Sequence, residues 1–213
     1  MKSKWWVPLS GVVGIGLIFA AFPLMGSPPE ANKASGQEIA KYLHAHAHDM
    51  KTAILILSAA LLLLLIFTSY VKTRLDDAEG ECGTASRLSF AGALMLIFAL
   101  ALDLTGLIAM VEAAGKIDPV AIQAMMAYWN NDWVPMALGV VAFHLGVAVS
   151  SLKHGGIPKW LGALSAVIVV VGVTPHWGFF AMPATAAWIV LASITLAIKA
   201  LRTPDAPPPP MAA

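Results

Sequence analysis

Six long apolar stretches constrain the fold of this chain more than any other feature of its sequence. A helix that crosses a bilayer needs about 20 largely apolar residues. Stretches of this kind occupy residues 6–25, 52–71, 88–111, 133–152, 160–173 and 184–201. Only 12% of the 213 residues are charged, about half the share found in soluble domains. The sequence therefore predicts an all-α fold, a polytopic transmembrane helix bundle of six spans within residues 1–203.

The placement of lysine and arginine predicts which way these spans run. Positive residues gather on the cytoplasmic side of membrane proteins. With a cytoplasmic N-terminus, nine of the 13 lysines and arginines fall inside, and four fall outside, at Lys33, Lys41, Lys51 and Lys116. We expect a multi-pass protein of a bacterial inner (plasma) membrane with both termini in the cytoplasm. Residues 204–213 are proline-rich and are predicted to form a disordered cytoplasmic tail.

Three histidines alternate just before the second span, at positions 44, 46 and 48. Ser35 and Glu38 match the S-x-x-E capping box, in which two side chains satisfy the first free N–H groups of a helix. We therefore expect one helix that runs from this box into the second span. On such a helix His44 and His48 are one turn apart on the same face, and His46 points away from them.

Two imidazoles on one helix face raise the possibility of a metal site on the outer surface. Two ligands do not make a site, and His176 in a later outer loop is the candidate for a third beside His44 and His48. Methionines near the outer ends of the spans would suit Cu(I). A surface that responds to pH, because histidine titrates near neutrality, is the alternative, and so is an ordinary polar surface.

Asp103 and His144 stand out because they lie inside predicted spans. At 1.5 Å per residue they are roughly 12 and 16 Å from the outer ends of the third and fourth spans. Polar groups at such depths face the bundle interior and are paired, so we expect these two to face each other. The pair could be a structural hydrogen bond, could carry protons or a cation, or could orient His144 as a ligand of haem or another tetrapyrrole metal.

Small residues on the first span predict close helix packing. Ser10 and Gly14, and then Gly16 and Ala20, have the small-xxx-small spacing that lets two helices approach closely. Lateral association with other membrane subunits would use such faces.

Three short stretches resemble a broad group of uncharacterised bacterial integral membrane proteins with six spans. They are Trp5, Leu9, Ser10 and Gly11 at the start of the first span, RLDDAEG at 74–80, and IPKWLGAL at 157–164. The resemblance implies a six-span topology and carries no catalytic residues, because the group has no settled activity. The three histidines are not part of the pattern.

No catalytic motif such as a P-loop, H-E-x-x-H or G-x-S-x-G occurs in the sequence. The leading hypothesis is therefore a non-enzymatic accessory or scaffold subunit of a membrane complex, without a cofactor, whose partners are lipid and other membrane subunits. A net charge of +1 gives no reason to expect nucleic acid. The alternatives are a small transporter or copper-handling protein that uses Asp103, His144 and the outer histidines, and a haem- or tetrapyrrole-binding subunit that uses His144.

Overall fold

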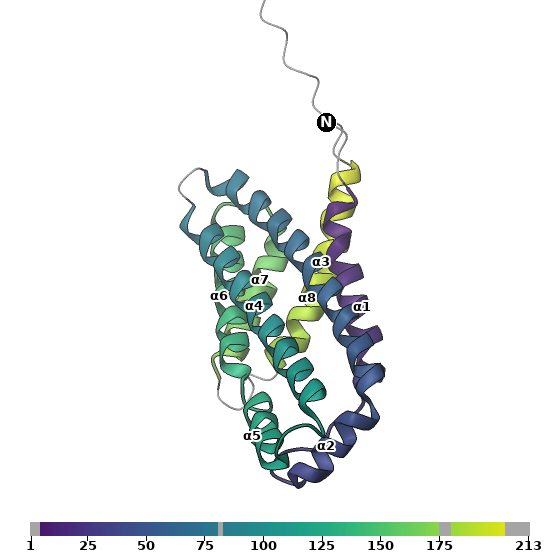
Figure 1. Cartoon of the computed structure of the whole chain (residues 1–213). Coiled ribbons are helices and arrows are strands. Elements are labelled where there is room, and N and C mark those ends of the chain that lie inside the picture. The colour runs from purple at the N-terminus through teal and green to yellow at the C-terminus, as the bar shows by residue number, and fades with distance from the viewer. Residues whose placement is uncertain (1–4, 81–82, 175–179, 203–213) are drawn as a thin grey trace, which may run out of the picture.

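The computed structural model describes residues 5–80, 83–174 and 180–202, and this part of the chain is largely helical, with short turns and one longer connection at residues 26–35 (Figure 1). Its elements are a 3-10 helix, η1 (Val7–Leu9), and the α-helices α1 (Ser10–Met25), α2 (Gly36–Ala45), α3 (Ala47–Glu79), α4 (Thr84–Ala113), α5 (Pro119–Trp129), α6 (Trp133–Lys153), α7 (Lys159–Gly172) and α8 (Ala181–Arg202). His176 and the predicted tail 204–213 lie outside the described residues.

Five segments of the described chain are long and apolar enough to cross a membrane. They are Val7–Met25, Ala47–Glu79, Thr84–Ala113, Pro119–Lys153 and Ala181–Arg202. The fifth predicted span corresponds to α7, which is apolar but has only 14 residues, or about 21 Å, against a hydrocarbon core of about 30 Å. The protein is a multi-span helical membrane protein, and the crossing by α7 stays a prediction.

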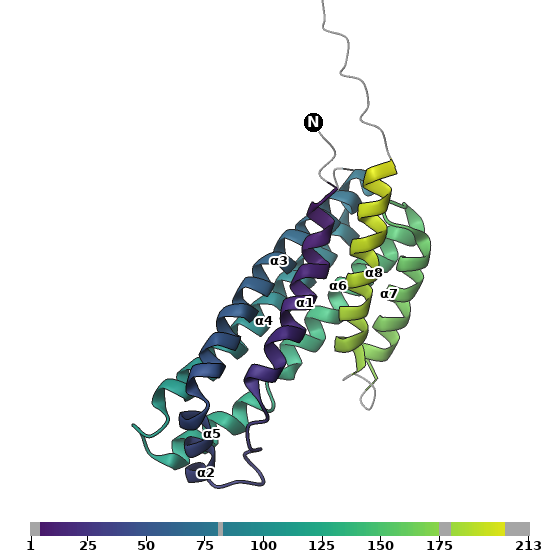
Figure 2. The same ribbon diagram turned by 90° about the vertical axis from the view of Figure 1, so that its right-hand side faces the viewer.

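The helices lie side by side, and the described ends of the chain lie at the same end of the bundle (Figure 2). At that end α3 turns into α4, α6 turns into α7, and α8 ends (Figure 1). Lysines and arginines of the described chain gather near these turns and ends: Lys72, Arg74, Arg87, Lys153, Lys159, Lys199 and Arg202. The opposite end is covered by α2 and α5, so the two ends of the bundle differ in charge and in architecture.

The two short helices α2 and α5 form a layer, and each of them begins with a side-chain cap. Ser35 accepts a hydrogen bond from the backbone N–H of Glu38, whose carboxylate in turn accepts from the backbone N–H of Ser35 at 2.8 Å, so the predicted capping box is present. Asp118 accepts from Val120 N at 2.8 Å and caps α5. Gln123 of α5 then donates to the carbonyl oxygens of Ala31 and Ala34, at 2.9 and 3.0 Å. These bonds join α5 to the segment just before α2, and the two short helices contact each other as one cover.

Glycines make the contact between α4 and α6 very close. A Cβ on Gly92 of α4 would overlap the backbone nitrogen of Phe143 on α6. From the α6 side, a Cβ on Gly139 would lie 2.6 Å from the backbone nitrogen of Leu96, and one on Gly146 would overlap Ser89. The two backbones therefore pack directly against each other, which the sequence pattern did not indicate.

The small residues of α1 divide between two faces. Ser10 and Gly14 are buried, and a Cβ on Gly14 would lie 3.2 Å from both the carbonyl oxygen of Ala60 and the side chain of Leu64. Gly16 and Ala20 are exposed, and a Cβ on Gly16 would meet no atom within 4 Å. The first pair therefore packs within the chain, and the second does not.

Candidate functional site

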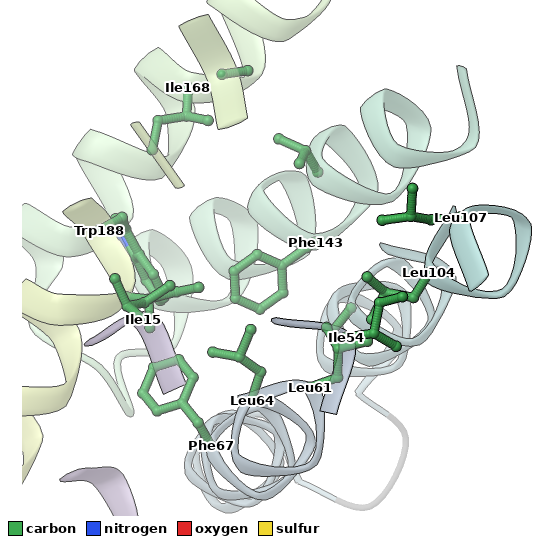
Figure 3. Close-up of a cluster of buried hydrophobic side chains, with 14 of the residues drawn as sticks. Ile15, Ile54, Leu61, Leu64, Phe67, Leu104, Leu107, Phe143, Ile168 and Trp188 are labelled. Carbon is green, nitrogen blue, oxygen red and sulfur yellow. The ribbon is translucent and has the colours of Figure 1, made fainter. Parts of the chain in front are cut away.

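Aromatic side chains at the centre of the bundle surround one polar group. Figure 3 shows Phe67, Phe143 and Trp188 converging from α3, α6 and α8. The ring of Trp188 meets Phe143 edge-on with a centroid distance of 5.4 Å, and meets Phe67 at 6.4 Å. His144 lies against the same indole, with a centroid distance of 5.2 Å and an interplanar angle of 88°. The side chain of His144 is fully buried, so its ring must find hydrogen-bond partners within the protein.

Both ring nitrogens of His144 have such partners on neighbouring helices. Nδ1 is 3.1 Å from the hydroxyl oxygen of Ser165 on α7, and Nε2 is 3.0 Å from that of Thr185 on α8. Both hydroxyl-bearing residues are buried. The three side chains form what we call the His144 network, and it ties α6, α7 and α8 together.

The positions of the protons in the His144 network follow from one further contact. The hydroxyl of Thr185 donates to the carbonyl oxygen of Ala181 at 2.7 Å. A threonine hydroxyl has a single proton, so Thr185 must accept from His144, whose Nε2 therefore carries a hydrogen. The neutral ring then has its lone pair on Nδ1, where Ser165 donates to it. This assignment satisfies every polar atom of the three side chains with a neutral imidazole.

The indole of Trp188 closes the network on one side. Its Nε1 donates to the carbonyl oxygen of Leu161 on α7 at 3.0 Å, and the side chain is fully buried. A buried indole N–H needs such a partner. The bond adds a second link between α7 and α8. The short helix α7 is thus held by polar contacts from both of its neighbours.

The expected pairing of Asp103 with His144 is wrong, because both nitrogens of His144 are taken by hydroxyl groups. Asp103 lies on α4, and its nearest interacting charged group is instead Asp132, at the beginning of α6. A similar depth in two neighbouring spans does not fix which faces of the helices meet, and α4 turns Asp103 toward the end of the bundle covered by α5.

The histidines before the second span do not share one helix. α2 ends at Ala45 and α3 begins at Ala47, with His46 between them at φ −106° and ψ 14°. The His46 ring stacks on Tyr42 with a centroid distance of 4.1 Å, and its Nδ1 is 2.9 Å from the carbonyl oxygen of Tyr42. His44 and His48 are exposed on two different helices. The prediction of a continuous helix through this stretch is therefore wrong.

The proposed outer metal site is only partly covered by the structure. Among the described residues, no group of three or more His, Cys, Asp or Glu side chains could hold a metal ion. The third predicted ligand, His176, lies outside those residues. The ligand set His44, His48 and His176 therefore stays a prediction, without the shared helix face on which it rested.

The motif residues behind the family resemblance serve contacts at helix ends. In IPKWLGAL, the carbonyl oxygen of Ile157 accepts from the hydroxyl of Ser151 at 3.0 Å, and Leu161 accepts from Trp188. In RLDDAEG, Asp76 accepts from Ser86 at 2.6 Å and pairs with Lys72. These short sequences therefore shape the turns between α6 and α7 and between α3 and α4.

No family model, no curated protein and no solved structure matches this chain. The resemblance to uncharacterised six-span proteins accordingly stays a prediction. Helix length, apolar composition and packing identify the chain as a multi-span helical membrane protein.

Proposed function

We propose that the protein is a non-enzymatic accessory or scaffold subunit of a membrane complex. One observation carries the proposal: the buried polar atoms of the His144 network bond to one another and to the backbone of their own bundle. A resident haem on His144 would need a ring nitrogen with a free lone pair, and both nitrogens are engaged by hydroxyl groups. The network's task is then to hold three helices in a fixed arrangement.

A scaffold also needs a face for its partner, and α1 offers one. Gly16 and Ala20 are exposed one turn apart, at the spacing that lets a second helix approach closely. Ser10 and Gly14 already face the inside of the chain. The partner we infer is a transmembrane helix of another subunit, packed on the Gly16 side of α1.

Site-specific photo-crosslinking in native membranes tests this assignment. A photoreactive amino acid at Val13, which is exposed one turn before Gly16, should give a discrete adduct with a second protein. The same group at Val167, 57% exposed on α7, is the matched control and should give lipid adducts. Lipid adducts alone from both positions would overturn the proposed docking face.

We also place the protein in a bacterial inner membrane with both termini in the cytoplasm. The support is the gathering of lysine and arginine at the end of the bundle where α8 ends, since such residues favour the cytoplasmic side. We would introduce single cysteines at Lys116 and Lys153 in a Cys82→Ser background and apply a membrane-impermeant maleimide to spheroplasts. The cysteine at position 116 should be labelled, and the one at position 153 should not. Labelling at Lys153 and not at Lys116 would reverse the orientation.

A second candidate function, proton or cation handling, is favoured by the contact between Asp103 and Asp132. Two neighbouring carboxyl groups in a membrane protein are the kind of pair that can take up a proton and exchange it for a cation. In proteoliposomes with an internal pH dye, Asp103→Asn should abolish any cation-driven proton flux that the wild type shows. Glu112→Gln, which changes an exposed carboxylate on the same helix, should leave that flux unchanged. No flux in the wild type would remove this candidate.

A further inference from the structure

The geometry points to a phospholipid-binding groove between α3 and α4 that takes one acyl chain and places the phosphate beside Lys51 and Lys116. The groove is lined by Ile54, Ser58, Leu61, Leu62 and Leu65 of α3 and by Ile97, Ala101, Leu104, Thr105 and Ile108 of α4. Each set follows the same helical spacing, so each is one stripe along its helix. The two stripes face each other across the groove, which continues the bundle core outward.

The lining has no free polar group. The hydroxyl of Ser58 donates to the carbonyl oxygen of Ile54 at 2.8 Å, and that of Thr105 donates to Ala101 at 2.8 Å. Both hydroxyl protons are thus used within their own helices, and no charged residue lines the groove. Apolar cavities of this kind do not hold ordered water, so the occupant must be hydrocarbon.

The dimensions of the groove suit a single lipid chain. Its volume is about 430 Å³, and the distance from Ile54 to Leu65 is about 17 Å at 1.5 Å per residue. The mean cross-section is then about 25 Å². A helix about 10 Å wide needs about 80 Å². A single hydrocarbon chain, whose carbons keep neighbours at about 4 Å, needs on the order of 20 Å².

Charged groups mark the end of the groove near α2 and α5. One turn beyond Ile54, Lys51 forms an ion pair with Glu112 of α4, and Lys116 lies 3.5 Å from the same carboxylate. Two lysines share one glutamate, so the ion-paired group of Lys51, Glu112 and Lys116 carries a net positive charge of its own. A lipid whose chain follows the groove brings its phosphate to these ammonium groups, and an anionic headgroup is favoured over a zwitterionic one.

Native mass spectrometry of the detergent-solubilised chain, titrated with phosphatidylglycerol, tests the groove. We expect one tightly retained lipid per protein. Ala101→Phe fills the groove and should weaken retention by about tenfold or more, because each methylene of the chain loses its burial. Ala59→Phe places the same bulk at a similar depth on an exposed position of α3 and should retain the lipid. Equal loss, or no loss, in both variants would overturn the proposal.

Two further measurements complete the test. The first uses the wild-type protein, so that a folding defect of a variant cannot explain the result, and the second locates the headgroup. Wild-type protein in vesicles containing phosphatidylglycerol with a diazirine on its acyl chain should give adducts concentrated on the groove stripes. Adducts spread evenly over exposed positions such as Leu94 and Val167 would contradict a site. Lys116→Gln should reduce the preference for phosphatidylglycerol over phosphatidylcholine while one lipid is still retained. An unchanged preference would show that the phosphate does not bind beside Lys116.

Discussion

His144 on α6 donates from Nε2 to the hydroxyl oxygen of Thr185 on α8, at 3.0 Å, while the Thr185 hydroxyl donates to the carbonyl oxygen of Ala181. Thr185→Val keeps the shape of the side chain and removes the acceptor, so it leaves a buried N–H without a partner. We expect a loss of about 1 kcal/mol in the free energy of unfolding, between the average for polar contacts in membrane bundles and the cost of an unpaired group. Steric trapping or SDS titration in micelles measures it.

The double variant His144→Phe with Thr185→Val provides the control for that prediction. Removing both partners leaves no unpaired N–H at this contact, and the hydroxyl of Ser165 loses its partner to the same extent as in His144→Phe alone. We therefore expect the double variant to lose less free energy of unfolding than the two single variants lose in sum. Strict additivity would mean that the hydrogen bond contributes nothing to the bundle.

The His144 network also predicts the spectrum of the purified protein. An axial haem ligand needs a nitrogen lone pair, and the Nδ1 lone pair of His144 accepts from Ser165 at 3.1 Å. Protein purified gently, without a polyhistidine tag, should show no Soret band. His144→Phe should have the same spectrum as the wild type. A Soret band that disappears in His144→Phe would show that the network opens to admit a cofactor.

Copper is tested on the same sample by elemental analysis. His44 and His48 lie on different helices, and His46 is stacked on Tyr42, so the local stretch provides no preformed pair of ligands. We expect less than one copper per chain after mild chelation. Stoichiometric copper that is lost together in His44→Ala and His48→Ala would restore the metal hypothesis and identify His176 as the next residue to change.

Sequence signals that act within a few residues predicted the structure well. The five longest membrane helices coincide with predicted apolar stretches, because a helix in lipid satisfies all of its backbone groups by itself. The capping box of Ser35 and Glu38 was likewise predicted, since its atoms are three residues apart. In the histidine stretch the same local reasoning failed. The helix breaks at His46, whose ring stacks on Tyr42, and helical periodicity in the sequence does not indicate such a break.

Contacts between helices were predicted poorly, since they depend on which faces meet. Asp103 and His144 have similar depths, but rotation of α4 and α6 brings Asp103 to Asp132 and leaves His144 to hydroxyls on α7 and α8. Gly14 and Gly16 look alike in the sequence, yet one is buried and the other is open. Serine and threonine on an apolar helix are common, so nothing in the sequence singled out Ser165 or Thr185 as partners.

The capping box makes the order of α2 depend on pH. Hydrogen bonds from the backbone and side chain of Ser35 lower the pKa of Glu38 below its ordinary value. A carboxyl group with a lowered pKa stabilises the folded form above its unfolded pKa, and this contribution is lost as the pH falls through the folded pKa. Amide hydrogen exchange in α2, corrected for intrinsic rates, should therefore show less protection as the pH falls from about 5 to about 3.

Glu38→Gln separates this effect from general acid unfolding. The amide keeps the side-chain length and has no titratable proton, so protection in α2 should no longer depend on pH in that window. Protection in α6 serves as the internal reference and should be the same in both proteins. An identical pH dependence of α2 in wild type and Glu38→Gln would show that another group is responsible.

Gly92 and Gly16 give the most direct test of helix packing, because the same substitution meets opposite surroundings. A Cβ on Gly92 would overlap the backbone of Phe143, which cannot move without shifting α6, whereas a Cβ on Gly16 meets nothing within 4 Å. Gly92→Ala should therefore destabilise the protein by about 1–3 kcal/mol, as overpacking does. Gly16→Ala should range from neutral to a gain of about 1 kcal/mol, since alanine favours a helix over glycine. Thermal unfolding in detergent compares the two, and equal shifts would mean that α4 and α6 are not in backbone contact. If Gly16→Ala also lowers the crosslinking yield from Val13 in native membranes, the added methyl group blocks the partner helix that we place on this face.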